Sequence, residues 1–312
     1  MLEVFTKVLP IFLYCTVGVV GRKTAILSQE TINQIKKLVL NIIFPCLLFP
    51  LFLLMELNIN HMGLVLLMML ILALDCVAGY FVNRLPFLRI KTLPLYCSAF
   101  SYASLGIPLY ALMHGTENLP IFAVMGVGHE LFVWLIYYSL VRFTLAKEKL
   151  NAKMVLSKLF TPVIVAILSG LLLNILGIGR WMQSQMLMQS LVDGVALVGA
   201  LFAPLTLLCV GYNMRVNKKY VTKGMKLVVV RLLVTFSVAY ALKPLYDMLV
   251  VPSSLTNAAF FTWAVLPPVY SYTLMMGEDV PEKDKAVVDT ASILQTIINM
   301  GIFIGYHVIH AA

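Results

Sequence analysis

The chain has 312 residues, of which 61% are apolar and only 12% are charged, and its mean hydropathy is +0.94. This composition excludes a soluble domain with a charged surface and indicates a polytopic membrane protein. The formal net charge of +9 would suggest a nucleic-acid partner in a soluble protein. Here the lysines and arginines gather in alternate loops between apolar segments, so no nucleic-acid partner is expected.

Ten apolar stretches are long enough to cross ~30 Å of hydrocarbon as helices, at roughly 20 residues each. They lie near residues 4–21, 34–54, 61–83, 94–113, 119–141, 156–177, 187–210, 227–250, 255–276 and 287–309. Basic residues concentrate in the first, third, fifth, seventh and ninth loops, with Lys36 counted in the first and Arg231 in the seventh. By the positive-inside rule these loops are cytoplasmic. The sequence therefore predicts a multi-pass protein of the plasma (inner) membrane, embedded in the lipid bilayer with both termini extracytoplasmic.

Prolines and glycines recur in register in the two halves of the chain. The first and sixth stretches each place a glycine eight residues after a proline, and the second and seventh each carry a proline in an apolar run that contains phenylalanine: Pro10 with Gly18, Pro162 with Gly170, Pro45 and Pro204. The offset of roughly 150 to 160 residues indicates an internal duplication into residues 1–145 and 146–312. Because each copy has an odd number of helices, the second must lie inverted in the bilayer. The predicted fold is all-α, with ten transmembrane helices in two inverted five-helix repeats.

The fourth and ninth stretches are expected to be broken helices. Pro267 and Pro268 are adjacent inside the ninth, and a proline in a helix interior removes a hydrogen bond and clashes with the preceding turn. In the fourth, Pro108 likewise precedes an aliphatic residue and a tyrosine. An interruption at membrane depth survives only where protein buries it or where it lines a wet cavity. Broken helices in corresponding halves therefore predict a transporter's binding site at their crossing.

Short motifs along the whole chain resemble the auxin efflux carrier family of permeases, in the short prokaryotic-type form. They are Leu9-Pro10-Ile11-Phe12, Gly18, Arg22-Lys23, Phe44-Pro45-Cys46-Leu47-Leu48-Phe49, Gly106-Ile107-Pro108-Leu109, Leu266-Pro267 and Gly277-Glu278-Asp279. The resemblance implies a ten-helix inverted repeat, with a scaffold of spans 1, 2, 6 and 7 that forms a homodimer and a mobile domain of spans 3 to 5 and 8 to 10. It also implies an elevator mechanism and carboxylate-bearing organic anions as substrates. Members often carry an asparagine where this chain has Ser101, and this departure favours a small carboxylate over auxin.

Helix ends and hydroxyl groups at the two breaks form the predicted substrate site. Free amides at the start of a half-helix behave as a partial positive charge, so they can hold an anion without a buried lysine. Hydroxyls can donate to a carboxylate and reorient when it leaves. The predicted substrate-binding residues are Ser101, Ser104, Pro108, Tyr110, Pro267, Pro268, Tyr270 and Ser271. Close helix packing by serine, and tyrosine at the membrane interface, are the structural alternatives.

Three ionisable residues fall well inside apolar stretches: Asp75, His129 and Glu130. A charge at mid-depth costs ~2.5 to 3.5 kcal/mol on insertion scales, so such residues are functional hypotheses by default. Carrying a proton reduces that cost, so these three are predicted to serve proton coupling, with a structural pair between helices as the alternative. In the tenth stretch a polar stripe is expected to face the ninth-helix break; it comprises Asp289, Ser292, Gln295, Thr296 and Asn299.

These features predict a secondary active transporter of small organic anions, mono- or dicarboxylates, that works by alternating access. A coupled proton, a coupled sodium ion and uniport without a coupled ion all stay open. A monovalent cation/proton antiporter on a similar inverted-repeat fold, and a channel, are the alternatives. No enzyme is expected, because Val133 occupies the second histidine position of the zinc-protease pattern that begins at His129 and Glu130. The sequence predicts no catalytic residue, metal site or cofactor, and the five cysteines show no disulfide or zinc spacing.

Overall fold

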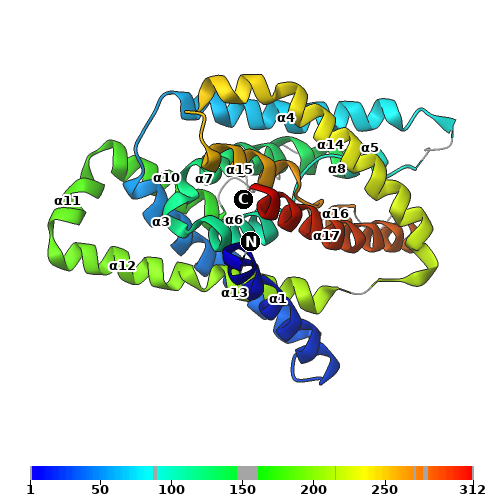
Figure 1. Cartoon of the computed structure of the whole chain (residues 1–312), viewed down its shortest axis with the longest axis horizontal. Coiled ribbons are helices and arrows are strands. Elements are labelled where there is room, and N and C mark those ends of the chain that lie inside the picture. The colour runs from blue at the N-terminus through cyan, green and yellow to red at the C-terminus, as the bar shows by residue number, and fades with distance from the viewer. Residues whose placement is uncertain are drawn as a thin grey trace.

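The computed structural model describes residues 2–86, 90–145, 161–214, 216–269, 272–276 and 280–310. Every regular element in these ranges is a helix (Figure 1). The α-helices are α1 (Leu2–Lys23), α2 (Gln29–Leu38), α3 (Phe44–Leu54), α4 (Asn60–Val82), α5 (Leu93–Tyr96), α6 (Ile107–His114), α7 (Leu119–Phe132), α8 (Tyr138–Thr144), α10 (Pro162–Ile175), α11 (Ile178–Ser184), α12 (Met186–Ala200), α13 (Phe202–Asn213), α14 (Val221–Leu249), α15 (Ser254–Ala264), α16 (Tyr272–Met275) and α17 (Glu282–His310). The π-helical turns are η1 (Val39–Ile43), η3 (Tyr102–Gly106) and η5 (Val133–Tyr137), and the 3-10 turns are η4 (Thr116–Asn118) and η6 (Lys218–Tyr220).

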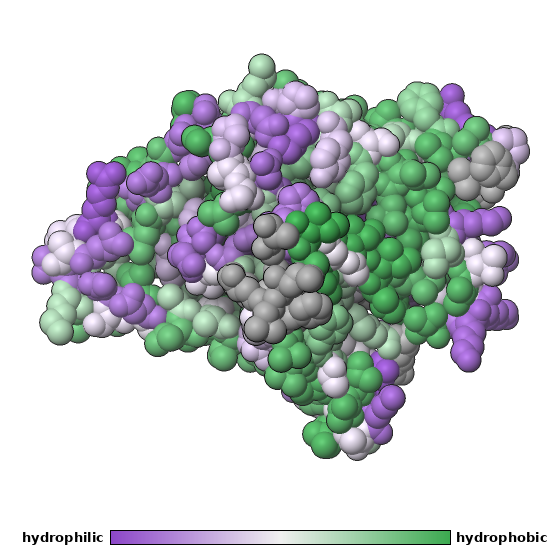
Figure 2. Space-filling view, viewed as in Figure 1, coloured by the Kyte–Doolittle hydropathy of each residue, from purple (hydrophilic) through white to green (hydrophobic). Residues whose placement is uncertain are grey.

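Within these ranges, six helical segments are long and apolar enough to cross a membrane. They are Gln29–Leu54, Asn60–Val82, Thr116–Thr144, Met186–Asn213, Lys218–Leu249 and Glu282–His310. The pair α10 and α11, bent by 79° at its junction, is a seventh candidate. Large apolar side chains face outward, as at Leu187 and Leu197, and Figure 2 shows broad hydrophobic surface on the face in view. The fold is therefore that of a polytopic α-helical membrane protein, while the number of ten spans remains a prediction.

The helices of the two halves pack on each other reciprocally. Helix α1 crosses α13 at Gly18, where an added Cβ would lie 2.1 Å from the Leu208 carbonyl oxygen. Helix α10 crosses α3 at Gly170, where an added Cβ would lie 2.9 Å from the Phe49 carbonyl oxygen. Both glycines are ones that the sequence matched between the halves. A larger residue at either position would push the two helix backbones apart.

Side chains four residues after these glycines cap the C-terminal ends of the partner helices. Arg22 donates to the Tyr212 carbonyl and, at 3.0 Å, to the Met214 carbonyl, at the end of α13. Asn174 donates to the carbonyls of Phe52 and Met55, at 2.9 and 2.7 Å, at the end of α3. Carbonyls in the last turn of a helix lack intrahelical donors, so each side chain satisfies two such groups. Both contacts thus join a helix of one half of the chain to the end of a helix of the other half.

Helices α4 and α14 run along one long side of the molecule, α12 and α13 along the other, and α6, α7 and α15 lie between them (Figure 1). Helix α4 packs on both α7 and α14, and α14 packs on α17. The main buried apolar cluster joins α4 and α14 to this middle layer and includes the fully buried Trp263 and Tyr272. The middle layer therefore places the interrupted segments inside protein.

The ninth apolar stretch is interrupted where Pro267 and Pro268 predict it. Helix α15 ends at Ala264 and α16 begins at Tyr272. The Ser101 amide donates to the Pro267 carbonyl at 2.8 Å, and the Val269 amide donates to the Ala99 carbonyl at 3.3 Å. The unwound segment of the ninth stretch therefore pairs with an unwound segment of the fourth through an isolated antiparallel bridge. This pairing supplies partners for backbone groups that have no helical ones.

The interruption in the fourth stretch lies elsewhere than predicted. Helix α5 ends at Tyr96, and the chain becomes helical again at Tyr102, so residues 97–101 are unwound. Pro108 lies in the first turn of α6, directly after the π-helical turn η3. A proline is tolerated in the first turn of a helix, and here the helix widens rather than breaks. The prediction of a break at Pro108 was therefore wrong, and the break ends at Ser101, before Ser104.

Candidate functional site

A cavity of about 650 Å³ lies against the paired unwound segments. Its walls come from α2 and η1, η3, the end of α7, α13, α17 and the two breaks. Its polar lining among the described residues is Lys36, Ser101, Tyr102, Ser104, His129, Glu130, Thr206, Asn213, Asp289, Ser292 and Thr296, and apolar side chains such as Phe100, Trp134 and Phe202 complete the wall. The cavity is therefore amphipathic and large enough for a small organic molecule.

Ser101 joins the two breaks at the edge of the cavity. Its amide donates to the Pro267 carbonyl at 2.8 Å, and its hydroxyl donates to the Pro268 carbonyl at 2.6 Å. Its own carbonyl accepts from the amides of Leu105 and Gly106, at 2.9 and 3.1 Å, which begins the helix. Ser101 thereby fixes the start of the η3 and α6 helix against the ninth-stretch break.

The amides of Tyr102, Ala103 and Ser104 precede the first intrahelical hydrogen bond of that helix, and all three residues line the cavity. Such amides carry the partial positive charge of a helix N-terminus. The Ser104 hydroxyl lies at the same place and can donate to a bound oxygen. This corner of the cavity offers hydrogen-bond donors, the chemistry that an anion requires.

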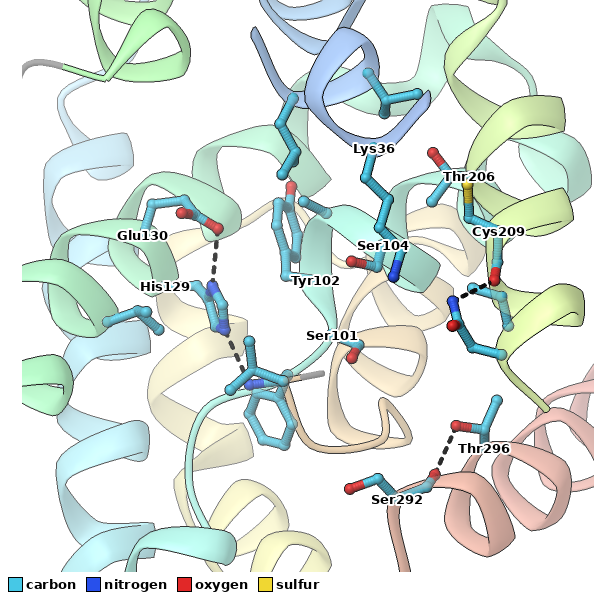
Figure 3. Close-up of a pocket in the computed structure, with 18 of the residues that line it drawn as sticks. Lys36, Ser101, Tyr102, Ser104, His129, Glu130, Thr206, Cys209, Ser292 and Thr296 are labelled. Atoms are coloured by element: carbon cyan, nitrogen blue, oxygen red, sulfur yellow. Dashed lines mark hydrogen bonds and ion pairs between the residues drawn. The ribbon is translucent and has the colours of Figure 1, made fainter. Parts of the chain in front are cut away.

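His129 and Glu130 form a pair beside the crossing (Figure 3). The Phe100 amide donates to His129 Nε2 at 2.9 Å, so this nitrogen is an acceptor and the ring proton lies on Nδ1. His129 Nδ1 lies 3.3 Å from Glu130 Oε1, and Trp134 Nε1 donates to Glu130 Oε2 at 3.0 Å. Both carboxylate oxygens are therefore engaged, and the imidazole links the carboxylate to the unwound segment.

Lys36 supplies a positive charge that the sequence prediction did not place here. It is the only lysine or arginine among the described residues that line the cavity. Figure 3 shows its side chain extending from α2 toward Ser104. The sequence analysis counted it as a loop charge, yet it lies within α2 and is half-buried. Ile32 and Val39 are buried, and their spacings of four and three residues from Lys36 put all three on one helix face.

Several predicted residues lie outside the cavity lining. The Tyr110 hydroxyl donates to the Leu255 carbonyl at 3.3 Å, within the packed interior. On α17, Gln295 Oε1 accepts from the Tyr96 hydroxyl at 3.1 Å, and Asn299 donates to the Val265 carbonyl at 2.5 Å. Gln295 and Asn299 thus bind residues next to the two breaks and do not line the cavity. Asp289, Ser292 and Thr296 of the same stripe do line it. Tyr270 and Ser271 lie outside the described residues.

Asp75 is fully buried in α4 and is not part of the cavity lining. Helix α4 packs on α14, which carries Arg231, a residue that the positive-inside count assigned to the seventh loop. That assignment was wrong, since Arg231 is fully buried within α14 and donates to backbone carbonyls of the fourth stretch. Its position inside the apolar stretch of residues 227–250 was the signal for burial.

No protein-family model matches the chain, and no curated protein matches it. The resemblance to auxin efflux carriers therefore stays a prediction that rests on the motifs. The class that the fold defines is a helical membrane protein. Its candidate functional site among the described residues is the cavity at the paired breaks.

Proposed function

We propose that the protein is a secondary transporter of small organic anions, with its substrate site in the cavity at the paired breaks. The observation that carries this proposal is the position of the cavity. It opens on an unwound backbone inside a membrane-type fold, where interruptions are tolerated only if they are buried or line a cavity. Paired discontinuous helices around such a site are typical of secondary transporters.

The corner of the cavity at Lys36 and η3 favours an anion. Lys36 has no ion-pair partner among the described residues, and the helix amides at Tyr102 to Ser104 add partial positive charge. The two acidic residues of the lining already have donors, since Glu130 accepts from Trp134 and Asp289 accepts from Thr273 at 2.9 Å. A carboxylate bound between Lys36 and Ser104 would accept hydrogen bonds from this set of donors. The apolar wall would contact the body of a mono- or dicarboxylate.

The reciprocal packing of the halves supports alternating access by an inverted repeat. Gly18 and Gly170, and likewise Arg22 and Asn174, play equivalent parts at an offset of 152 residues, which is 170 − 18 and 174 − 22. We therefore assign residues 1–145 and 146–312 to two inverted five-helix copies. Spans 1, 2, 6 and 7, which comprise α1, α2 with α3, α10, and α12 with α13, form the scaffold, and the helices of spans 3 to 5 and 8 to 10 carry the breaks past it. The cavity lies between these two groups, where such a movement would change its access.

The His129 and Glu130 pair is the proposed proton-coupling site. It lines the cavity, and His129 touches the unwound segment through the Phe100 amide. A proton taken up by Glu130 would remove the charge facing His129 Nδ1 and so alter the support of that segment. His129 therefore connects the Glu130 carboxylate to the unwound segment at the proposed substrate site.

Uptake of radiolabelled carboxylates into proteoliposomes, with imposed proton or sodium gradients, tests this function. We expect saturable uptake of a mono- or dicarboxylate that an imposed proton gradient increases, with protein-free liposomes as the control. Exchange of an inorganic cation without carboxylate movement would replace the proposal with a cation antiporter. Carboxylate flux that stays linear in concentration and shows no acceleration by counter-substrate would indicate a channel.

A further inference from the structure

Arg231 reaches from α14 across the interior to the unwound segment of the fourth stretch. Its Nη1 donates to the Tyr96 carbonyl and, at 2.9 Å, to the Ser98 carbonyl, and its Nη2 donates to the Ala99 carbonyl at 2.9 Å. Its guanidinium carbon lies 4.9 Å from the centre of the Phe100 ring. The planar fork of an arginine suits this task, because it can bind several acceptors at once. One side chain thus donates to three backbone carbonyls within the five residues that precede Ser101.

The segment that Arg231 holds has a strained backbone. Ala99 has φ of +52°, in the left-handed region that a residue with a Cβ rarely adopts. Such a conformation persists only where the surroundings determine it. The Ala99 carbonyl accepts from both Arg231 and the Val269 amide, and Ser98 donates to the Leu72 carbonyl at 2.8 Å. Arg231 is the charged member of this set of restraints.

Asp75 completes the arrangement from α4. It is fully buried, and among the described residues neither carboxylate oxygen has a hydrogen-bond partner. Arg231 is also fully buried, and its Nε has no hydrogen-bond partner within the described part of the chain. Helices α4 and α14, which carry these two side chains, pack on each other. A buried charge is tolerated when an opposite charge compensates it, so the carboxyl group on α4 can serve as counter-ion to the guanidinium on α14.

We infer that Arg231 is the positioning residue of the candidate site and that Asp75 is its buried counter-ion. The guanidinium fixes residues 96–99, which fixes Phe100 on His129 and Ser101 on Pro267 and Pro268. The helix amides and Ser104 are thereby held at the cavity wall. This assignment rests on the proposed function and gives Asp75 a different part from proton coupling. In this assignment Asp75 compensates the buried charge of Arg231, and it does not line the cavity.

Four variants test the inference in carboxylate uptake: Arg231→Gln, Arg231→Lys, Asp75→Asn and the double variant Asp75→Asn with Arg231→Gln. Lys226→Gln on the exposed face of α14 is the matched control for loss of one charge. We expect Arg231→Gln to raise KM about tenfold or more with a smaller change in the maximal rate, since the charged hydrogen bonds act on site geometry. Arg231→Lys should recover part of this loss. Asp75→Asn should impair the parent but add little to Arg231→Gln, because a counter-ion matters only while its partner is present.

Hydrogen exchange supplies a readout that does not require transport. Arg231→Gln should accelerate exchange of the Ser101, Leu105 and Gly106 amides, while the amides of α3 and α10 keep the parental rate. If Arg231→Gln fails to fold, Arg231→Lys decides, since it keeps the charge and should raise both KM and local exchange. Parental KM and parental exchange in Arg231→Lys and Arg231→Gln would overturn the inference. A uniform loss of stability with unchanged KM would overturn it as well. If the parent moves no carboxylate, the proposed function fails, and the exchange measurement still decides the role of Arg231.

Discussion

Replacing Lys36 with glutamine removes the positive side-chain charge from the described cavity lining while keeping a polar side chain of similar length. A hydrogen bond to a charged group contributes about 1.5–3 kcal/mol to stability or binding. Lys36 is half-buried and water screens it in part, so the lower end of that range, ~1.5–2 kcal/mol, applies. At about 1.4 kcal/mol per factor of ten, KM for a carboxylate should rise roughly 10- to 30-fold.

Initial rates of carboxylate uptake into proteoliposomes, measured over a range of concentrations, check this value. Lys37→Gln is the matched control, because Lys37 is the next residue of the same helix, carries the same charge and is exposed. Lys37→Gln should leave KM within about twofold, since exposed charges contribute little. An equal rise of KM in both variants would show that only the general surface charge matters. No rise in either would refute binding of the anion at Lys36.

Three further predictions follow from the packing and from the proton site. Gly18→Val should lower the melting temperature of the purified protein in detergent, because overpacking costs typically ~1–3 kcal/mol. Gly194→Ala is the control, since an added Cβ at Gly194 has nothing within 4 Å, and it should leave the melting temperature unchanged. Equal melting temperatures would show that α1 does not pack closely on α13. Asn174→Ala should also lower the melting temperature, since two carbonyls of α3 lose their donor at a cost of ~1 kcal/mol or more, and a parental value would remove this cap from the account. Glu130→Gln cannot take up a proton but keeps one acceptor oxygen for His129 or Trp134, so substrate exchange should continue while accumulation driven by a proton gradient is lost. Parental accumulation in Glu130→Gln would show that the carboxylate is structural.

The sequence located the ninth-stretch break because its cause is local. Pro267 and Pro268 both lack amide hydrogens, so two successive helical hydrogen bonds are lost at one place and each ring clashes with the preceding turn. The break in the fourth stretch has no such local cause. Residues 97–101 are unwound because Arg231, His129 and the ninth-stretch backbone supply partners from far along the chain. Pro108 attracted the prediction, although a proline in a first helical turn is compatible with the helix.

Part of the candidate site was accessible from residue type and depth alone. Ser101, Ser104, His129 and Glu130 were predicted, and the cavity brings them together. Lys36 and Arg231 were missed because the positive-inside rule counts basic residues near span ends and says nothing of the direction in which they point. Helical register could have placed Lys36 on the buried face with Ile32. The pairing of Arg231 with the Asp75 region depends on contacts between α4 and α14, which no local pattern encodes.

Protection of a cavity cysteine by substrate tests the central claim most directly. In a variant whose native cysteines at positions 15, 46, 76, 97 and 209 are replaced, Ser104→Cys would react with a maleimide from the cavity, and Thr222→Cys on α14 would serve as the control. If the cavity at the paired breaks binds the transported anion, a saturating carboxylate that the parent transports will slow labelling of Ser104→Cys and leave Thr222→Cys unchanged. Equal labelling of Ser104→Cys with and without that carboxylate would contradict the account and place the substrate elsewhere.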